Sequence, residues 1–283
     1  MHISEAITSP ANPRVKRVAQ LRDAASRRKT GLTLVDGLRE LSRAAAAGIE
    51  IVEVFVELVA DLDGAGAARL PPGLEECVAA CVARGAVVIG LSSRAFARVA
   101  FGDRNEGLVG VVRFKMRGLS EVTFAAGRPL LVAEGVEKPG NLGAILRTVD
   151  AAGLAGMIVS DPRTDAANPA TIRASLGTVF SVPLAVAATA DVIRWCQRAG
   201  RRVVVATPDG PKEWFKTALV GDVAIVVGSE AEGVSDAWNR AAAAGDLALE
   251  MVRLPMRGLA DSLNVSATAA VLAYESVRQE GSR

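Results

Sequence analysis

Apolar positions in the first part of the chain occur in short runs that alternate with segments of helical periodicity. The expected strands are residues 32–35, 51–56, 87–91 and 107–114, and the expected helices are residues 38–48, 74–85 and 93–100. Strands that alternate with helices in this way predict a small sheet covered by helices.

From Pro129 onward the apolar runs contain few polar positions. Strands are expected over residues 129–135, 156–161, 201–208 and 223–230, and helices over residues 141–153, 169–177, 191–200 and 261–279. Continuous Val, Ile and Leu character is typical of parallel strands that are covered on both faces. Ligands of open parallel sheets bind at the carboxyl ends of the strands, so we expect a ligand site in the loops after Gly135, Ala206 and Gly228.

A polar segment over residues 116–128, interrupted by Gly118 and Gly127, separates the two parts. At roughly 150 residues per domain, a length of 283 residues also indicates about two domains. We therefore expect an α/β domain over residues 1–115, a linker over residues 116–128, and a second α/β domain with a parallel sheet over residues 129–283.

The composition is that of a globular protein with a core of Ala, Val, Leu and Ile, because 50% of the residues are hydrophobic, 23% are charged and 4% are aromatic. No apolar run approaches the ~20 residues that cross a bilayer. Residues 1–14 contain no apolar stretch of the kind found in signal peptides. These features predict a cytoplasmic protein that does not bind to membranes.

Cysteine and histidine usage restricts the chemistry. The chain has 3 cysteines, too few and too scattered for a disulfide framework or a four-ligand zinc site, and we expect Cys77 and Cys81, one helical turn apart, to pack in the core. The only histidine is His2. This excludes Ser-His-Asp triads, Cys-His pairs and most His-ligated metal sites.

The 33 basic and 31 acidic residues are unevenly distributed along the chain. Residues 12–29 contain a basic run opposed only by Asp23, and its members are Arg14, Lys16, Arg17, Arg22, Arg27, Arg28 and Lys29. A second basic run extends from Arg84 to Arg117, and an acidic stretch over residues 50–76 lies between the two. Such a distribution is typical of a surface that follows a phosphate backbone, although solvated helix faces give the same pattern.

Three segments of the second part carry candidate chemistry. The first is a strand and a loop, followed by a helix that opens near Asn141 and bears Arg147; the free backbone N–H groups of such a helix start can hold an anion. The segment lacks G-x-G-x-x-G and is therefore no dinucleotide fingerprint. For any single residue here, an ordinary helix start followed by an exposed arginine is the favoured interpretation.

The second segment is a strand that runs into Gly228, Glu230 and Gly233. Val234 stands where a phosphate-binding loop has its Lys, which disfavours nucleotide hydrolysis. As a lone feature, a glutamate here is also an ordinary helix cap.

The third segment is a strand and a loop, followed by a terminal helix that Asp261 or Ser262 is expected to cap. Ser262 and Asn264 place a hydroxyl and an amide near its start. A capped helix docked on the sheet is the plain structural interpretation.

In this order, N-L-G-A-I-x-R-T, V-V-G-S-E-A-E-G-V, and L-P-M followed by S-L-N-V-S-A-T-A-A resemble the three motifs of the SpoU/TrmH family. This family comprises S-adenosylmethionine-dependent RNA ribose 2′-O-methyltransferases of the SPOUT class. The resemblance covers residues 130–279. Residues 9–41 are similar to the substrate-binding domain, related to ribosomal protein L30e, that precedes the catalytic domain in ribosomal RNA members.

The resemblance implies a deep trefoil knot in the second domain and a homodimer whose active sites lie near the subunit interface. It implies a site for S-adenosylmethionine at Thr207, Gly228, Leu254, Met256, Ser262 and Leu263. The implied catalytic residues are Asn141, Arg147, Glu230, Ser262 and Asn264. The expected RNA-binding residues are Arg17, Arg27, Arg28, Lys29 and Arg173, the last of which lies with Ser175 in a further family element.

The implied reaction is an in-line displacement in which the ribose 2′-oxygen attacks the sulfonium methyl, without a metal. The enzyme must align the two groups, exclude water and help to remove one proton. The family assigns activation of the hydroxyl to Arg147, but a guanidinium keeps its proton in the ordinary pH range. We therefore expect Arg147 to hold a phosphate or to stabilise negative charge on oxygen, and the identity of the base stays open.

The L30e-like domain favours 23S ribosomal RNA over transfer RNA as the substrate. The resemblance extends to enzymes that protect antibiotic producers by methylating their own ribosomes, including thiostrepton and avilamycin resistance enzymes, but the sequence does not determine the target nucleotide or a resistance phenotype. One alternative is a transfer RNA 2′-O-methyltransferase. A second is a non-catalytic RNA-binding or ribosome-assembly protein. Isothermal titration with the cofactor alone would distinguish this alternative from an active methyltransferase. A third is a small-molecule methyltransferase, which leaves the basic run without a purpose.

Overall fold

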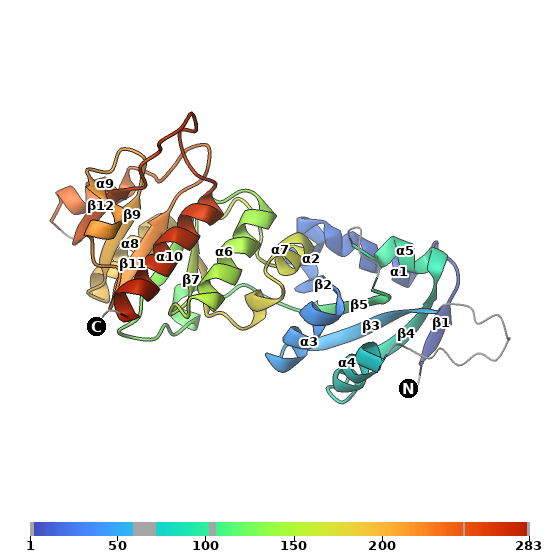
Figure 1. Ribbon diagram of the computed structural model, residues 1–283. Helices are drawn as coiled ribbons and strands as arrows, with labels where there is room; N and C mark the ends of the chain where they lie inside the picture. Colours follow the sequence, from blue (N-terminus) through green and yellow to red (C-terminus); the bar gives the residue numbers. More distant parts are fainter. Residues whose placement is uncertain (1–2, 59–71, 102–105, 246, 282–283) are drawn as a thin grey trace. The chain divides into compact units, whose positions relative to one another are not determined.

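The computed structural model describes residues 3–58, 72–101, 106–245 and 247–281, which form two compact units (Figure 1). Unit 1 comprises Met1–Lys115 and Ala167–Ser181, and unit 2 comprises Met116–Ala166 and Val182–Arg283. Residues 116–128, the expected linker, thus belong to unit 2, and Phe124 of this segment lies in the unit 2 core. Residues 167–181 pack with unit 1, although they lie within the span expected for the second domain.

Unit 1 contains a mixed sheet of five strands in the order β1-β4-β3-β5-β2. β1 and β3 pair in parallel with β4, whereas β5 pairs antiparallel with both β2 and β3. The strands are β1 (Glu5–Ile7), β2 (Leu32–Asp36), β3 (Ile51–Leu58), β4 (Val87–Ser92) and β5 (Leu108–Arg113). β2 to β5 correspond to the four strands that hydrophobic patterning predicts, and β1 is an addition at the edge of the sheet.

The helices of unit 1 bury apolar faces against this sheet. They are α1 (Pro13–Ala19), η1 (Gln20–Arg22), α2 (Ala24–Thr30), α3 (Leu38–Ala46), α4 (Pro72–Val82), α5 (Ser93–Val99), α7 (Pro169–Ala174) and η3 (Thr178–Phe180). α1 begins where Asn12 accepts a hydrogen bond from the backbone N–H of Arg14 at 2.8 Å, with Pro13 as its first residue. Val15 and Val18 then pack in the core with Phe55.

Two side chains hold residues 167–181 within unit 1. The Thr33 hydroxyl donates to the backbone carbonyl of Ala167 at 2.6 Å, and the Arg43 guanidinium donates to the carbonyl of Leu176 at 2.8 Å. α7 packs against β2. A segment with a helical pattern does not reveal in the sequence which of two sheets it covers, so only these tertiary contacts decide its place.

Unit 2 contains a sheet of seven strands in the order β10-β12-β9-β11-β6-β7-β8, and all neighbours pair in parallel. The strands are β6 (Leu130–Glu134), β7 (Met157–Ser160), β8 (Leu184–Ala187), β9 (Arg202–Ala206), β10 (Lys212–Glu213), β11 (Val223–Val227) and β12 (Leu249–Arg253). The predicted parallel sheet is confirmed. β8 and β10 lie at its edges and were not among the expected strands.

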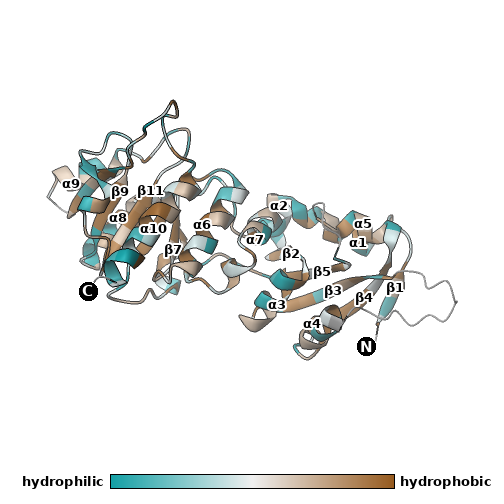
Figure 2. Ribbon diagram, viewed as in Figure 1, coloured by the Kyte–Doolittle hydropathy of each residue, from teal (hydrophilic) through white to brown (hydrophobic). Residues whose placement is uncertain are grey.

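Helices cover both faces of this sheet, as its continuous apolar strands require. They are η2 (Leu119–Glu121), α6 (Pro139–Ala151), α8 (Thr189–Arg198), η4 (Trp214–Lys216), α9 (Ala237–Ala243) and α10 (Val265–Gly281). α6 and α10 pack side by side (Figure 1). α8 and α9 cover the other face, where the fully buried Trp238 packs against Val132 and Val226. Figure 2 shows the hydrophobic strands between helices with mixed faces.

Asn264 caps α10, in place of the expected Asp261 or Ser262. Its side-chain oxygen accepts from the backbone N–H of Ser266 at 2.9 Å, and its carbonyl accepts from the N–H of Thr268 at 3.0 Å. The cap lies later than expected because Asp261 to Leu263 remain in the loop. Strand order and helix packing do not test the trefoil knot, which stays a prediction. Within the described ranges, no helix is long and apolar enough to cross a membrane.

Candidate functional site

A cavity of about 380 Å³ lies at the carboxyl edge of the unit 2 sheet. It is formed where three neighbouring strands, β12, β9 and β11, run into their loops. Thr207 follows β9, Gly228 follows β11 and Leu254 follows β12. The carboxyl ends of parallel strands meet at one edge, so residues from three distant parts of the chain line the same cavity.

The structure brings all six residues expected at a cofactor site to this cavity. These residues are Thr207, Gly228, Leu254, Met256, Ser262 and Leu263. Sequence reasoning missed further lining residues, including Asp209, Val265 and Thr268. Asp209 follows the same strand as Thr207, so the rule of strand ends could have found it. Val265 and Thr268 line the cavity only because α10 begins beside it.

The loop after β11 is folded tightly on itself. Ser229 and Gly233 exchange two backbone hydrogen bonds of 3.0 Å, and the Ser229 hydroxyl accepts from the N–H of Glu232 at 3.0 Å. A Cβ atom on Gly228 would lie 2.1 Å from the carbonyl carbon of Gly233, closer than any side chain permits. The loop therefore requires glycine at position 228, and its shape presents residues 228–234 to the cavity.

Asn141, Glu230 and Asn264 form a polar cluster beside the cavity. The amide nitrogens of Asn141 and Asn264 each donate to Oε1 of Glu230 at 2.7 Å. The amide nitrogen of Asn264 also lies 3.2 Å from Oδ1 of Asn141, and Lys138 Nζ lies 3.1 Å from Oε2 of Glu230. These residues come from the start of α6, the loop after β11 and the cap of α10, which the packing of α6 on α10 brings together.

A second hollow of about 220 Å³ adjoins the first. Asn141 and Lys138 line it, and Glu230, Ala231 and Val265 line both hollows. A carboxylate that holds two amides therefore lines both of these adjacent hollows.

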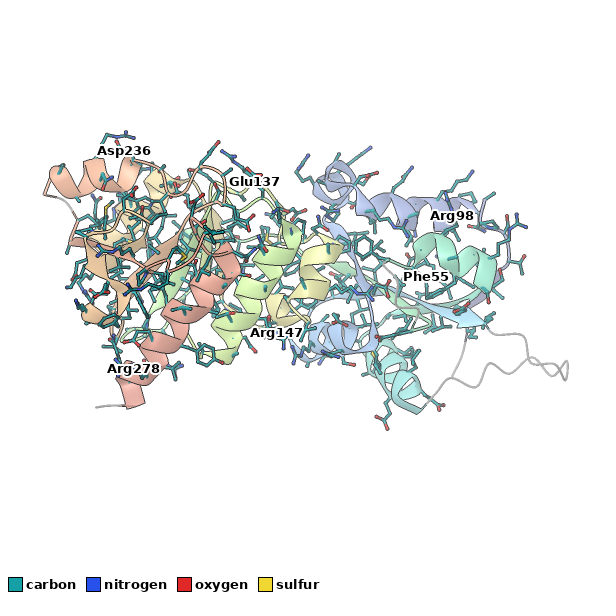
Figure 3. The ribbon with its side chains drawn as sticks, turned by 45° about the horizontal axis from the view of Figure 1, so that its top comes forward. Phe55, Arg98, Glu137, Arg147, Asp236 and Arg278 are labelled. Carbon is teal, nitrogen blue, oxygen red and sulfur yellow. The ribbon has the colours of Figure 1, made fainter. Side chains whose placement is uncertain are left out.

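Arg147 lies away from this cluster. It is exposed and lines neither hollow, and within the described ranges its side chain forms no hydrogen bond or ion pair. It follows Asn141 by six residues on α6, which corresponds to about 9 Å along the helix axis. Figure 3 labels it on α6, well beyond Glu137, which precedes the helix. Ser262 lines the larger cavity and not the smaller one.

The expected RNA-binding residues of unit 1 have different environments. Arg28 and Lys29 are exposed in the last turn of α2. Arg17 is exposed but donates to both carboxylate oxygens of Glu53, at 2.8 and 3.0 Å. Arg98, labelled in Figure 3, is exposed on α5. His2, residues 59–71 of the acidic stretch and Arg104 of the second basic run lie outside the described residues.

The structure contradicts the expected RNA-binding role of Arg27. Only 4% of it is exposed, and its guanidinium donates to the backbone carbonyls of Leu21 at 3.0 Å and Arg22 at 2.6 Å. It therefore ties α2 to the preceding turn and is not available to a phosphate. Within the run R-R-K, the sequence does not show that the first member turns inward.

Arg173 is also engaged within unit 1. Its guanidinium donates to the carbonyl of Phe101 and lies 3.8 Å from Oδ2 of Asp36. Burial raises the pKa of Asp36 to about 6, against the lowering effects of the Phe101 N–H and the Arg173 charge, while the charges of Glu106 and Glu40 raise it further. Arg173 thus stabilises a buried carboxylate.

The cysteines are free and buried, and Cys77 and Cys81 pack in the core as predicted. Within the described ranges, no group of three His, Cys, Asp or Glu residues is arranged to hold a metal ion.

Comparison with known proteins identifies two family matches. Residues 128–274 match the SpoU rRNA Methylase family, and residues 12–110 match the MRM3-like substrate binding domain.

Individual relatives agree with these matches. The chain is 29% identical over 282 residues to a 23S rRNA (adenosine(1067)-2′-O)-methyltransferase of Streptomyces laurentii, covering 99% of this chain and 97% of that protein. It is 30% identical over 187 residues to a 23S rRNA (uridine(2479)-2′-O)-methyltransferase of Streptomyces viridochromogenes, covering 63% of each. The AdoMet-bound rRNA methyltransferase of Sinorhizobium meliloti superposes with a TM-score of 0.82 and 28% identity, covering 97% of each chain.

The similarity thus extends over both units, and the first family match alone includes more than half of the residues. The motif order, the parallel sheet and the cavity at its carboxyl edge agree with it. The chain belongs to the SpoU rRNA Methylase family.

Proposed function

We propose that the protein transfers a methyl group from S-adenosylmethionine to the 2′-hydroxyl of a ribose in 23S ribosomal RNA. One observation carries the proposal: two adjoining hollows share Glu230 in their walls, and that carboxylate holds the amides of Asn141 and Asn264. A transfer reaction needs two substrates side by side, and this arrangement provides adjacent spaces with a fixed polar group between them.

The larger cavity fits the cofactor. Its volume of about 380 Å³ lies in the range of small-molecule sites. Leu254, Met256 and Leu263 offer apolar surface to a planar base, and the backbone around Gly228 offers polar groups that can fix its orientation. When bound, S-adenosylmethionine supplies an activated methyl group. The solved relative from Sinorhizobium meliloti contains AdoMet, which supports this assignment.

The polar cluster orients the ribose. Glu230 and Asn264 hold the side chain of Asn141 in one orientation, so that its second N–H group presents a fixed donor to a substrate in the smaller hollow. Ser262 lines the cofactor cavity and not the smaller hollow. The guanidinium of Arg147 holds a phosphate or stabilises negative charge on the 2′-oxygen.

The protein acts as a homodimer whose active sites lie near the subunit interface. An exposed Arg147 that lines neither hollow of its own chain supports this, because the residue then requires a second surface to reach a ribose. Exposed apolar side chains at Leu259, Tyr274 and Val277 provide an apolar surface for such an interface.

Unit 1 binds the RNA through its exposed cations, of which Arg28 and Lys29 belong to an uninterrupted basic turn. The two Streptomyces relatives act on an adenosine and a uridine of 23S rRNA. The target nucleotide therefore differs between relatives of comparable identity, and 23S rRNA is the substrate class that they share. The reaction takes place in the cytoplasm, where ribosomes are assembled.

The test is tritiated methyl transfer from S-adenosylmethionine to three substrates: transcribed 23S RNA, unmodified transfer RNA and intact ribosomal subunits. Incorporation into 23S RNA or large subunits, surviving alkali as a resistant dinucleotide, is the expected result. Incorporation only into transfer RNA would contradict the substrate. If isothermal titration detects no cofactor binding and no RNA is methylated, the protein is a non-catalytic RNA-binding protein.

A further inference from the structure

Glu134, the last residue of β6, carries a carboxylate that the proposed chemistry does not use. It is 5% exposed and lines neither hollow. Side chains alternate along a strand, so it points to the same face as Leu130 and Val132, toward the core that contains Trp238. Within the described ranges it forms no ion pair. A buried carboxylate without a cation must satisfy its oxygens with hydrogen-bond donors.

Three neutral donors satisfy this carboxylate. Trp238 Nε1 donates to Oε2 at 2.8 Å, and the backbone N–H of Ser235 donates to the same oxygen at 3.2 Å. On the other side, the Thr189 hydroxyl donates to Oε1 at 3.0 Å. The two oxygens therefore bind different segments of the chain. Oε2 accepts hydrogen bonds from residues that follow β11, and Oε1 accepts one from the first residue of α8.

The Oε2 side connects directly to the cofactor cavity. The loop after β11 lines the cavity from Gly228 to Val234, and Ser235 is the next residue. The start of this loop is fixed by β11 and its middle by the hydrogen bonds between Ser229 and Gly233. Its end is fixed by Glu134 through Ser235 and through Trp238 of α9.

We propose that Glu134 is a positioning residue that holds the loop after β11 in the shape that binds the cofactor. The proposal rests on the proposed function in one respect, namely that S-adenosylmethionine is the molecule in the cavity. Glu134 does not touch that molecule. It acts by determining where residues 228–235 lie, so its loss affects cofactor binding more than the turnover of the saturated enzyme.

The experiment compares two substitutions of similar volume in the full chain. Glu134→Met removes both acceptor oxygens, and Glu134→Gln keeps one oxygen for Trp238 and Ser235 while its amide can donate to the Thr189 hydroxyl. We expect Glu134→Met to raise the Kd and KM for S-adenosylmethionine about tenfold and to change kcat at saturation less than about twofold, with Glu134→Gln close to wild type. A folded Glu134→Met protein with unchanged Kd would overturn the proposal.

A second pair of variants applies if Glu134→Met does not fold. Trp238→Phe removes one donor from Oε2, and Thr189→Val removes the donor from Oε1 with little change in volume. We expect about a threefold rise in the cofactor Kd for Trp238→Phe and none for Thr189→Val, because only Oε2 holds the loop. Equal Kd values in both variants and in wild type would overturn the proposal.

Hydrogen–deuterium exchange without cofactor separates this proposal from the proposed function. Residues 228–236 should exchange faster in Glu134→Met or Trp238→Phe than in wild type, whereas β7 should not change. If the wild-type protein binds no S-adenosylmethionine, the proposed function fails while exchange still decides whether Glu134 orders the loop. Unchanged exchange in this segment would overturn the role of Glu134.

Discussion

Asn141 and Asn264 lie 123 positions apart in the chain, yet both donate to the same carboxylate oxygen of Glu230 at 2.7 Å. The start of α6 and the cap of α10 are thereby tied to the loop after β11. One carboxylate thus orients two amides beside the cofactor cavity. Removal of this carboxylate would therefore take the same hydrogen-bond acceptor from both amides.

Glu230→Ala should lower kcat roughly 10- to 100-fold, because hydrogen bonds to a charged group contribute about 1.5 to 3 kcal/mol and each ~1.4 kcal/mol is tenfold in rate. Glu230→Gln keeps an accepting oxygen and should lose less. Methyl transfer at saturating RNA and cofactor measures both. Lys138→Ala is the matched control, since an ion pair whose lysine is 72% exposed contributes little. A similar loss in Lys138→Ala would show that charge, and not orientation of the amides, is what matters.

Arg147→Ala should abolish methyl transfer and leave the Kd for S-adenosylmethionine and the melting temperature nearly unchanged. The side chain is exposed and lines neither hollow, so its removal disturbs no packing. Asp150→Ala, on an exposed position further along α6, is the control and should remain active. Activity retained by Arg147→Ala would refute the assignment.

Gly228→Ala should prevent cofactor binding, because the added Cβ would lie 2.1 Å from the backbone of Gly233 and the loop must open to admit it. Isothermal titration measures the loss. Gly140→Ala is the control, since a Cβ there meets nothing within 4 Å. Wild-type affinity in Gly228→Ala would mean that the closed loop is not the binding shape.

The basic turn of α2 permits a comparison between neighbours. Replacing Arg28 and Lys29 together by Ala should weaken RNA binding and reduce the salt slope by about two, since each phosphate contact contributes about one. Thermal stability should not change. Arg27→Ala should instead lower the melting temperature, because it removes buried hydrogen bonds to Leu21 and Arg22. An unchanged salt slope in the double variant would show that these charges are only solvated.

Asp36 makes stability depend on pH. Burial raises its pKa from 3.8 to about 6 in the folded protein, so the folded state favours the protonated acid. Its contribution to stability is fully present below about pH 4 and is lost as the pH rises through about 6, by an amount on the order of 1 to 2 kcal/mol. Asp36→Asn keeps an acceptor for the Phe101 N–H and should remove this dependence. Urea unfolding at pH 4.5 and 7.5 measures it, and an identical pH dependence in both proteins would contradict the assignment.

Much of unit 2 could be predicted from local patterns. Continuous apolar runs identify β6, β7, β9 and β11, because a strand covered on both faces has few polar positions. Once these strands are taken as parallel, their carboxyl ends must meet at one edge. For this reason the strand pattern alone predicts a ligand site in the loops after Ala206 and Gly228. The resemblance to the SpoU/TrmH motifs adds Leu254 to this site, and the order of the motifs identifies the family.

Tertiary structure decided what depends on contacts between distant segments. The sequence marks Arg27, Arg28 and Lys29 alike, but packing buries the first and exposes the others. It does not show that residues 167–181 pack with unit 1, or that Glu134 holds the end of the loop after β11. Sequence alone determined most of the strands, the residue types at the site and the family, because these follow from local periodicity and short motifs. Only the folded chain decided which side chains meet, because burial and hydrogen bonding depend on neighbours that local sequence does not specify.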